Sequence, residues 1–243
     1  MRVPAVSDRA QLALGFVSSP AMGCADFLVA DSNADAAGWL RRWPVWPTPT
    51  LIVHGPGGCG KTHLAHAFAG RTGASLVSAR ELAGIDPLAI LAGTPGAVID
   101  DAQACVGDSE RILLHLVNAV GETGRTLLLT ARQPAAHWPI ALADLRSRLK
   151  AATSVGIGEA DDALMRAVLG KLFVERQLRV GEEVLSYILA RIERSVAAAG
   201  LLVARLDAEA LATQRPVTIP LVRKLLDEKS ERGDPSGSGS PEC

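Results

Sequence analysis

Positions 55–62 read Gly55-Pro56-Gly57-Gly58-Cys59-Gly60-Lys61-Thr62, which fits the pattern G-x-x-x-x-G-K-[ST] of a phosphate-binding loop. Glycines let successive backbone N–H groups turn inward around phosphate oxygens. Lys61 supplies a positive charge for the outer phosphates, and the Thr62 hydroxyl is the expected magnesium ligand. The apolar run Thr50-Leu51-Ile52-Val53-His54 predicts a strand before the loop, and helical spacing predicts a helix after it that ends at Gly70. This context disfavours a chance match, so the sequence predicts binding of a nucleoside diphosphate or triphosphate.

The composition is that of a globular protein rather than a dedicated nucleic-acid binder. The 243 residues are 48% apolar with a net charge of −1, so a core is possible and no basic excess is present. The chain has no apolar run of about 18 residues and no signal-like N-terminus. Its four cysteines show neither C-x-x-C spacing nor a disulfide framework. We therefore expect a soluble, cytoplasmic protein with no membrane contact.

Beyond the loop, strand patterns alternate with helical ones. Further strands are expected at residues 75–78, 97–100, 125–130 and 153–157. The run at 125–130 is apolar almost throughout, as in strands buried on both faces of a parallel sheet. This alternation predicts an α/β fold of three layers around a five-stranded parallel sheet.

The pattern divides the chain into four parts. From residue 159 only helical periodicity is present, and after 226 almost nothing is apolar. The predicted parts are a flexible N-terminal segment (1–23), an α/β nucleotide-binding domain (24–158), a helical lid domain (159–226) and a disordered tail (227–243).

Two strand ends carry polar residues suited to phosphate chemistry. The strand at 97–100 ends in Asp100 and is followed by Asp101. Ligands of an open parallel sheet bind at the carboxyl ends of its strands, so Asp100 is expected beside the loop, holding magnesium, with Asp101 orienting the attacking water. Thr130 ends the next strand and is predicted to sense the terminal phosphate. The alternatives are an acidic turn and an ordinary strand-terminal threonine.

An arginine-rich segment, Asp144-Leu145-Arg146-Ser147-Arg148-Leu149, precedes the last predicted strand. The planar fork of arginine donates several fixed hydrogen bonds to phosphate oxygens. An arginine on a domain surface can serve the nucleotide of a neighbouring subunit in trans. The alternative is a solvated charge cluster.

An apolar hexamer, Gln11-Leu12-Ala13-Leu14-Gly15-Phe16, lies ahead of a Ser/Pro/Gly-rich linker at 18–23. It is either an edge strand of the domain or a peptide that docks in the groove of a partner. The sequence alone leaves both readings open.

Together these features resemble an AAA+ ATPase with a helical lid, and in detail the ATPase domain of DnaA, the bacterial replication initiator. The most similar stretches are Gly60-Lys61-Thr62-His63-Leu64, Val98-Ile99-Asp100-Asp101 and Val217-Thr218-Ile219-Pro220. The domain organisation is even more similar to that of the Hda-like regulators, which inactivate DnaA. These consist of a clamp-binding peptide and this ATPase module, without a DNA-binding domain, and no helix-turn-helix pattern follows Leu226 here.

The resemblance implies roles for the matching residues in nucleotide binding. The positions at the edge of the base are Asp26, Phe27, Leu28 and Asn33. The positions that hold the phosphates of ADP or ATP are Gly57, Gly58, Cys59, Gly60, Lys61, Thr62 and His63. Thr62 and Asp100 are the implied Mg²⁺ ligands.

The resemblance also implies partners. The hexamer, through Gln11, Leu12, Leu14 and Phe16, is similar to the peptide by which replication proteins dock on the β sliding clamp of DNA polymerase III. Arg148 falls on the arginine finger, which would act on ATP bound to DnaA. Asp101, Thr130 and Arg148 are thus the candidate catalytic residues.

Two departures from the family pattern predict weak hydrolysis by the chain itself. Ala197 occupies the position of the family's second-sensor arginine, and Arg194, three residues earlier, is expected to compensate only in part. Arg132 stands where the family has an acid after the first-sensor strand. Whether the chain is an enzyme is left open, and its main role would be to activate the ATPase of a partner.

Two functions follow. In the first, the chain docks on the clamp, meets DNA only through it, stimulates hydrolysis of DnaA-bound ATP and so prevents re-initiation of replication. In the second, it is an AAA+ ATPase of the helicase-loader or transposition-helper type that uses its own ATP cycle. A shortened initiator is disfavoured because no DNA-reading module is present. The sequence does not decide whether the chain forms a homo-oligomer.

Overall fold

A five-stranded parallel sheet forms the centre of the larger domain in the computed structural model, which describes residues 28–232. The strand order is β2-β3-β4-β1-β5, and all four pairings are parallel. The strands are β1 (Thr50–His54), β2 (Ser75–Ser78), β3 (Gly96–Asp100), β4 (Thr126–Ala131) and β5 (Thr153–Gly156). The three-layer α/β prediction is therefore confirmed, with β1 between β4 and β5.

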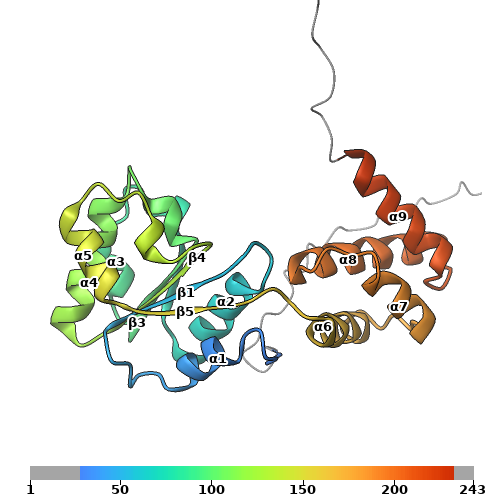
Figure 1. Ribbon diagram of the computed structural model, residues 1–243, viewed down its shortest axis with the longest axis horizontal. Helices are drawn as coiled ribbons and strands as arrows, with labels where there is room; N and C mark the ends of the chain where they lie inside the picture. The colour runs from blue at the N-terminus through green and yellow to red at the C-terminus, as the bar shows by residue number, and fades with distance from the viewer. Residues whose placement is uncertain (1–27, 233–243) are drawn as a thin grey trace, which may run out of the picture.

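Helices cover both faces of the sheet (Figure 1). One face is packed by α1 (Ala34–Arg41) and α2 (Lys61–Thr72), the other by α3 (Pro87–Leu91), α4 (Glu110–Thr123) and α5 (Ala143–Ala151). Short 3₁₀ turns, η2 (Ala79–Glu81), η3 (Ala102–Cys105) and η4 (Ala135–His137), fill the connections. Helices α2 and α5 therefore lie on opposite sides of the sheet.

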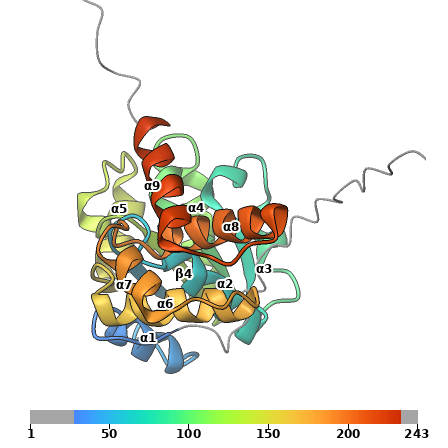
Figure 2. The same ribbon diagram turned by 90° about the vertical axis from the view of Figure 1, so that its right-hand side faces the viewer.

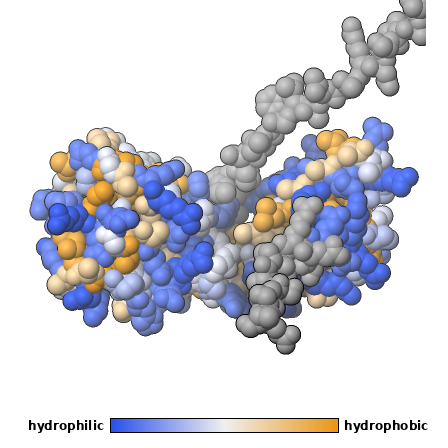
Figure 3. Space-filling view, turned by 90° about the horizontal axis from the view of Figure 1, so that it is seen from above, coloured by the Kyte–Doolittle hydropathy of each residue, from blue (hydrophilic) through white to orange (hydrophobic). Residues whose placement is uncertain are grey.

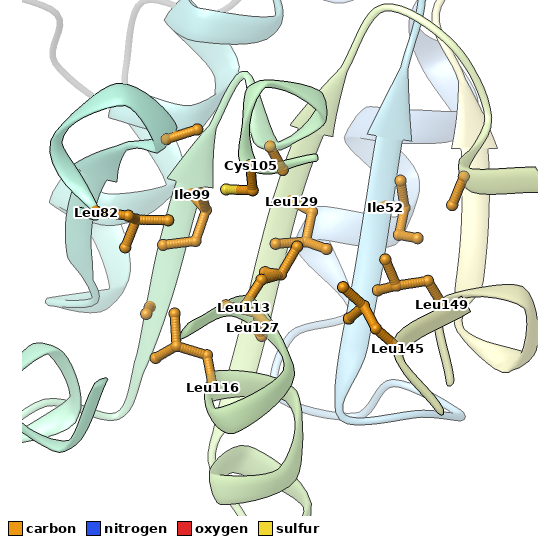
Figure 4. Close-up of a cluster of buried hydrophobic side chains, with 14 of the residues drawn as sticks. Ile52, Leu82, Ile99, Cys105, Leu113, Leu116, Leu127, Leu129, Leu145 and Leu149 are labelled. Carbon is orange, nitrogen blue, oxygen red and sulfur yellow. The ribbon is translucent and has the colours of Figure 1, made fainter. Parts of the chain in front are cut away.

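The alternation of strand side chains explains this arrangement. Ile52 and Leu129 join the core cluster under α3, α4 and α5, which Figure 4 shows with Leu113 and Leu145 packed against the strands. Their neighbours Leu51 and Leu128 instead join the cluster under α1 and α2. Strand side chains point alternately to the two faces, so apolar residues at every position require helices on both.

Helix α2 continues past the expected end at Gly70. It runs to Thr72, and Gly73, with φ of +75°, ends it in the left-handed conformation. The prediction was wrong because a left-handed glycine just past the last turn, not any glycine in the helix, is what stops a helix. Gly70 meets no neighbouring atom that a side chain would disturb.

The lid is a bundle of four helices on one side of the α/β domain (Figures 1 and 2). Its helices are α6 (Asp162–Glu175), α7 (Glu182–Leu189), α8 (Val196–Thr213) and α9 (Ile219–Arg232). They share one core, which includes Leu169, Ile188, Leu206 and Val222. Helix α9 passes the predicted start of a disordered tail at 227 and reaches Arg232, so residues 227–232 are helical and the prediction was wrong for them.

The α/β domain and the lid stand as two bodies joined by a narrow waist (Figure 3). The chain enters through residues 28–33, and Leu28 and Ala30 pack against the lid core. It crosses to the lid after β5, where the Gly158 N–H donates to the Ser32 carbonyl at 2.8 Å. In the described part of the chain, no helix is long and apolar enough to cross a membrane.

Candidate nucleotide-binding site

The phosphate loop lies at the carboxyl end of β1, between that strand and α2. The Gly55 N–H donates to the Ala131 carbonyl at 3.1 Å, which anchors the first residue of the loop to the end of β4. A side chain at Gly55 would meet the Ile157 carbonyl oxygen at 2.4 Å, so only glycine fits beside the exit of β5. At the other end, Gly60 (φ +100°) precedes the first residue of α2.

Lys61 points back into the loop. Its Nζ donates to the carbonyls of Gly55 (2.8 Å) and Pro56 (2.6 Å) and lies 3.6 Å from the Cys59 sulfur. The ammonium is thus held where phosphate oxygens would meet it, and backbone carbonyls of the same loop share its hydrogens. The motif predicts that this lysine binds the outer phosphates of a nucleotide, and the structure places its ammonium inside the loop.

Three side chains meet at the strand ends beside the loop. The Thr62 hydroxyl donates to Asp100 Oδ2 at 2.9 Å, and the Thr130 hydroxyl donates to Asp100 Oδ1. The Thr130 oxygen in turn accepts the Asp101 N–H at 2.9 Å. The structure therefore brings the three residues selected at the strand ends together with Thr62 of the loop, and the Thr130 hydroxyl here orients Asp100.

This donor set fits a magnesium ion. Mg²⁺ prefers oxygen ligands and keeps several waters, so one hydroxyl and one carboxylate beside nucleotide phosphates are a sufficient protein contribution. Thr62 and Asp100 already lie within hydrogen-bond distance of each other at this edge. Among residues 28–232 there is no cluster of three or more His, Cys, Asp or Glu, so no metal cage independent of phosphate is built.

Asp101 occupies an unusual backbone conformation at the end of β3. Its φ of 56° and ψ of 42° are left-handed, and it precedes the 3₁₀ turn η3. Non-glycine residues adopt this region rarely, although Asp and Asn do so more readily than others. Asp100 bonds to the two threonines through its carboxylate, whereas Asp101 bonds to Thr130 through its backbone N–H.

The histidine at the end of β1 is held in its neutral form. Burial lowers the pKa of His54, the last residue of β1, and the positive charges of His137 and Lys61 lower it further. A lowered pKa keeps this imidazole neutral near pH 7.

The lid touches the phosphate loop directly. The Val196 N–H, at the start of α8, donates to the Gly58 carbonyl at 2.8 Å. Gly58 has φ of +73°, and a Cβ there would lie 1.9 Å from Ser195 Oγ. Ser195 is buried and caps α8 by accepting the Ala198 N–H at 3.2 Å. The N-terminal turn of α8 therefore rests on the loop through a glycine that no other residue could replace without movement.

The two residues of this contact, Ser195 and Val196, lie between Arg194 and Ala197, the positions expected to bear on the second sensor. Ala197 is exposed at the start of α8. Arg194 forms an ion pair with Asp162 of α6, so its guanidinium is bound within the lid. Sequence analysis did not select Ser195, although a serine just before an apolar helical run is a recognisable N-cap.

The residues expected at the base edge are only partly described. Asp26 and Phe27 lie outside the described residues. Asn33 is buried and its amide is used locally, since its Oδ1 accepts the Ala30 N–H at 3.0 Å and its Nδ2 donates to the Leu28 carbonyl at 2.9 Å. Asn33 thus shapes the entry segment. An open hollow between this segment, α1 and α2 is lined by Val29, Leu40, Leu64, Phe68 and Arg71, among others.

Arg148 lies away from this chain's own loop. It is on α5, which packs against the face of the sheet opposite to α2. Its side chain is 47% exposed, and Nε donates to Asp144 Oδ1 at 2.9 Å within the same helix. The structure therefore does not bring Arg148 into the cluster around Lys61. The hexamer at 11–16, which is expected to bind the clamp, lies outside the described residues.

The geometry defines a P-loop nucleotide-binding fold with a helical lid, and comparisons with known proteins identify it as AAA+. Residues 162–226 match the family model described as the lid domain of Hda. The fold is similar to domain III of the replication initiation protein DnaA from Thermotoga maritima, with a TM-score of 0.74 and 16% identity over 86% of this chain and 97% of that one. It is also similar to AMPPCP-bound DnaA from Aquifex aeolicus, with a TM-score of 0.67 and 20% identity over 87% of this chain and 71% of that one.

A sequence relative extends the match. An uncharacterized protein of Haemophilus influenzae is 28% identical over 189 residues, which is 74% of this chain and 82% of that protein. The α/β domain and lid together therefore have the AAA+ fold, and the lid matches the family model of the Hda lid domain.

Proposed function

We propose that this chain is a regulator that inactivates DnaA by stimulating hydrolysis of the ATP bound to DnaA. It would supply Arg148 in trans while residues 11–16 hold it on the β sliding clamp of DNA polymerase III. The observation that carries this proposal is the place of Arg148. It is exposed on α5, on the face of the sheet opposite to the helix that begins at Lys61.

The chemistry suits an arginine in trans. A guanidinium that bridges phosphate oxygens neutralises charge that develops as the terminal phosphoryl group departs. In well-studied systems such an arginine contributes about 10³–10⁵ in rate. The lid match and the DnaA-like fold support DnaA as the partner whose nucleotide is acted on.

The chain's own nucleotide then has a structural role. ADP or ATP with Mg²⁺ would bind at Lys61, Thr62 and Asp100. The similarity of the fold to that of AMPPCP-bound DnaA supports this assignment. The Val196 contact places the lid on that same loop, so bound phosphates would fix the lid angle. With Ala197 exposed and Arg194 bound to Asp162, the chain's own hydrolysis is expected to be slow.

The test is a comparison of Arg148→Ala with Arg111→Ala, an exposed arginine of α4 on the same face of the sheet. Both proteins should fold, bind nucleotide and bind the clamp. Hydrolysis by ATP-loaded DnaA in the presence of clamp-loaded DNA should be stimulated by Arg111→Ala and not by Arg148→Ala. Equal stimulation by both would remove Arg148 from the proposal.

One observation favours a second function, an AAA+ ATPase of the helicase-loader or transposition-helper type. Lys61, Thr62, Asp100 and Asp101 form a complete phosphate and metal edge. An ATPase of this kind would turn over its own ATP without DnaA and would bind a helicase or single-stranded DNA instead of the clamp. Measured turnover of the isolated chain separates the two functions.

A further inference from the structure

A buried carboxylate stands at the start of α4, outside the phosphate site. Glu110 is 3% exposed although it is charged, and glutamate is rarely buried unless its oxygens are satisfied. It makes no ion pair within hydrogen-bond distance among the described residues. The hydrogen-bond donors around its carboxylate must therefore account for a negative charge in the interior.

The partners are backbone N–H groups that lead into α5. Oε1 and Oε2 accept the Ala141 N–H at 3.0 and 3.1 Å, and Oε2 accepts the Leu142 N–H at 2.8 Å. Oε1 also accepts the Gly107 N–H at 3.2 Å. Leu142 is the N-cap residue of α5. One carboxylate thus fixes the last two residues before the helix that carries Arg148.

Arg146 closes the same turn from the other side. Its backbone N–H donates to the Leu142 carbonyl at 3.0 Å, and its Nη1 donates to the Ile140 carbonyl at 3.0 Å. The N–H groups of Ala141 and Leu142 are therefore bonded to α4, and the carbonyls of Ile140 and Leu142 are bonded to α5. A segment with its backbone groups paired on both sides has little freedom to move.

The position of Arg148 depends on how α5 begins at Leu142. Leu145 and Leu149 are buried at helical spacing in the core shared with α4, which fixes the rotation of α5 (Figure 4). Arg148 lies between them in sequence and on the exposed side of the same turn. The helix has only nine residues, so a shift at Leu142 would be carried to Arg148 with little loss.

The electrostatics agree with a carboxylate that stays ionised. Burial acts to raise the pKa of Glu110, but the hydrogen bonds from Ala141, Leu142 and Gly107, together with the positive charge of Arg146, outweigh it and lower the pKa. Hydrogen bonds to the charged form have this effect in general. At neutral pH both oxygens are therefore acceptors.

We propose that Glu110 is a positioning residue for Arg148: its carboxylate fixes the first turn of α5 and thereby the place from which Arg148 reaches a partner's nucleotide. This inference rests on the proposed function of Arg148. A misplacement of about 1 Å at a reacting group can cost about a hundredfold in rate, so a residue that touches no substrate can control the rate through geometry.

The first test compares Glu110→Gln with Glu122→Gln, an exposed glutamate in the last turn of the same helix. Glutamine keeps the size of the side chain but turns one acceptor oxygen into an N–H donor that faces other N–H groups. We expect the maximal stimulated hydrolysis rate of DnaA-bound ATP to fall about tenfold or more with Glu110→Gln. The concentration of the chain that gives half-maximal stimulation should change less than about twofold, because only the geometry of the reacting group is altered.

A second pair of variants keeps Glu110 and removes one donor. Leu142 has φ of −73°, which proline adopts, so Leu142→Pro deletes the N–H without forcing the backbone. Leu142→Ala loses the same packing but keeps the N–H. We expect Leu142→Pro to stimulate several-fold less than Leu142→Ala. This pair decides the matter if Glu110→Gln does not fold.

Amide hydrogen exchange reports whether the N–H groups of segment 140–142 are hydrogen-bonded, and it needs no partner protein. The N–H groups of Ala141 and Leu142 should exchange faster in Glu110→Gln, while those of β1 remain protected. A wild-type maximal rate in Glu110→Gln, or equal maximal rates in Leu142→Pro and Leu142→Ala, would overturn the inference. Arg148→Ala is measured alongside: full stimulation by that variant would overturn the proposed function itself, whereas its loss with an active Glu110→Gln would overturn only the role of Glu110.

Discussion

Lys61 and Arg148 are two cations held in opposite ways. The Lys61 ammonium hydrogen-bonds to two carbonyls of its own loop, at 2.8 and 2.6 Å. The Arg148 side chain is 47% exposed and, within residues 28–232, bonds only to Asp144, itself 55% exposed, in the same helix. The first arrangement keeps a charge for a ligand bound inside this chain, and the second presents a charge at a surface. The difference teaches that nucleotide binding and the activity on a partner are separable here.

The largest predicted effect concerns the inward cation. Lys61→Ala should lower nucleotide affinity at least a hundredfold, because the Lys61 ammonium is a full positive charge that hydrogen-bonds inside the loop. Ligand bound to the folded state alone adds RT ln(1 + [L]/Kd), about 2.7 kcal/mol at a hundredfold excess over Kd, and the variant should lose that increment. Titration calorimetry measures the affinity, and an unchanged Kd would contradict the account.

The next prediction tests whether the lid rests on the loop. Gly58→Ala should lower the free energy of unfolding by about 1–3 kcal/mol, because alanine is strained at positive φ and its Cβ would overlap Ser195. Gly57→Ala is the matched control, since nothing lies within 4 Å of a Cβ there. Denaturant unfolding measures both.

A double variant separates the backbone strain of alanine at position 58 from its steric contact with Ser195. Ser195→Gly removes the atoms that the new Cβ would meet, so adding it to Gly58→Ala should recover part of the loss. Strictly additive losses in the double variant would show that α8 does not press on Gly58.

A smaller, pH-dependent effect is expected on the side of Arg148. The folded-state pKa of Glu110 lies below its ordinary value of 4.5, so its stabilising contribution is present above that value and is lost as the pH falls through the folded-state pKa. The free energy of unfolding of the wild type should therefore drop more than that of Glu110→Gln between about pH 5 and about pH 3. Parallel curves over this range would contradict the lowered pKa.

The smallest effect is expected at the exposed ion pair. Asp144→Asn should lower the free energy of unfolding by no more than about 0.5 kcal/mol, as is usual for exposed pairs four residues apart in a helix. Stimulation of DnaA should stay within about twofold of wild type. A tenfold change in either direction would mean that Asp144, and not the start of α5, sets the position of Arg148.

Local patterns were enough to predict the sheet and the phosphate loop. The run 50–54 became β1, and Asp100 lies beside Thr62 as strand-end reasoning predicts. These features depend on residues that are adjacent in sequence or brought together by the rule that ligands meet the carboxyl ends of parallel strands. The role of Thr130 as an orienting donor to Asp100 was not predicted, because it depends on which way one hydroxyl turns.

Contacts between distant segments could not be predicted in this way. Glu110 and Ala141 are 31 residues apart, and nothing in a serine-glutamate pair before an apolar helix indicates that its carboxylate reaches another helix. The contact of Ser195 with Gly58 likewise depends on how the lid is placed. The motif explains Gly58 by phosphate binding alone, whereas the structure adds that α8 lies against it.

The central claim is tested most directly by following only the nucleotide on DnaA. DnaA loaded with ATP labelled at the γ-phosphate is mixed with clamp-loaded DNA and with this chain carrying unlabelled nucleotide, and release of labelled phosphate is timed. We predict rapid release with the wild type and release slower by about 10³ or more with Arg148→Ala, with Arg148→Lys almost as slow because an ammonium lacks the planar fork. Release at the wild-type rate with Arg148→Ala would contradict the claim that Arg148 acts in trans.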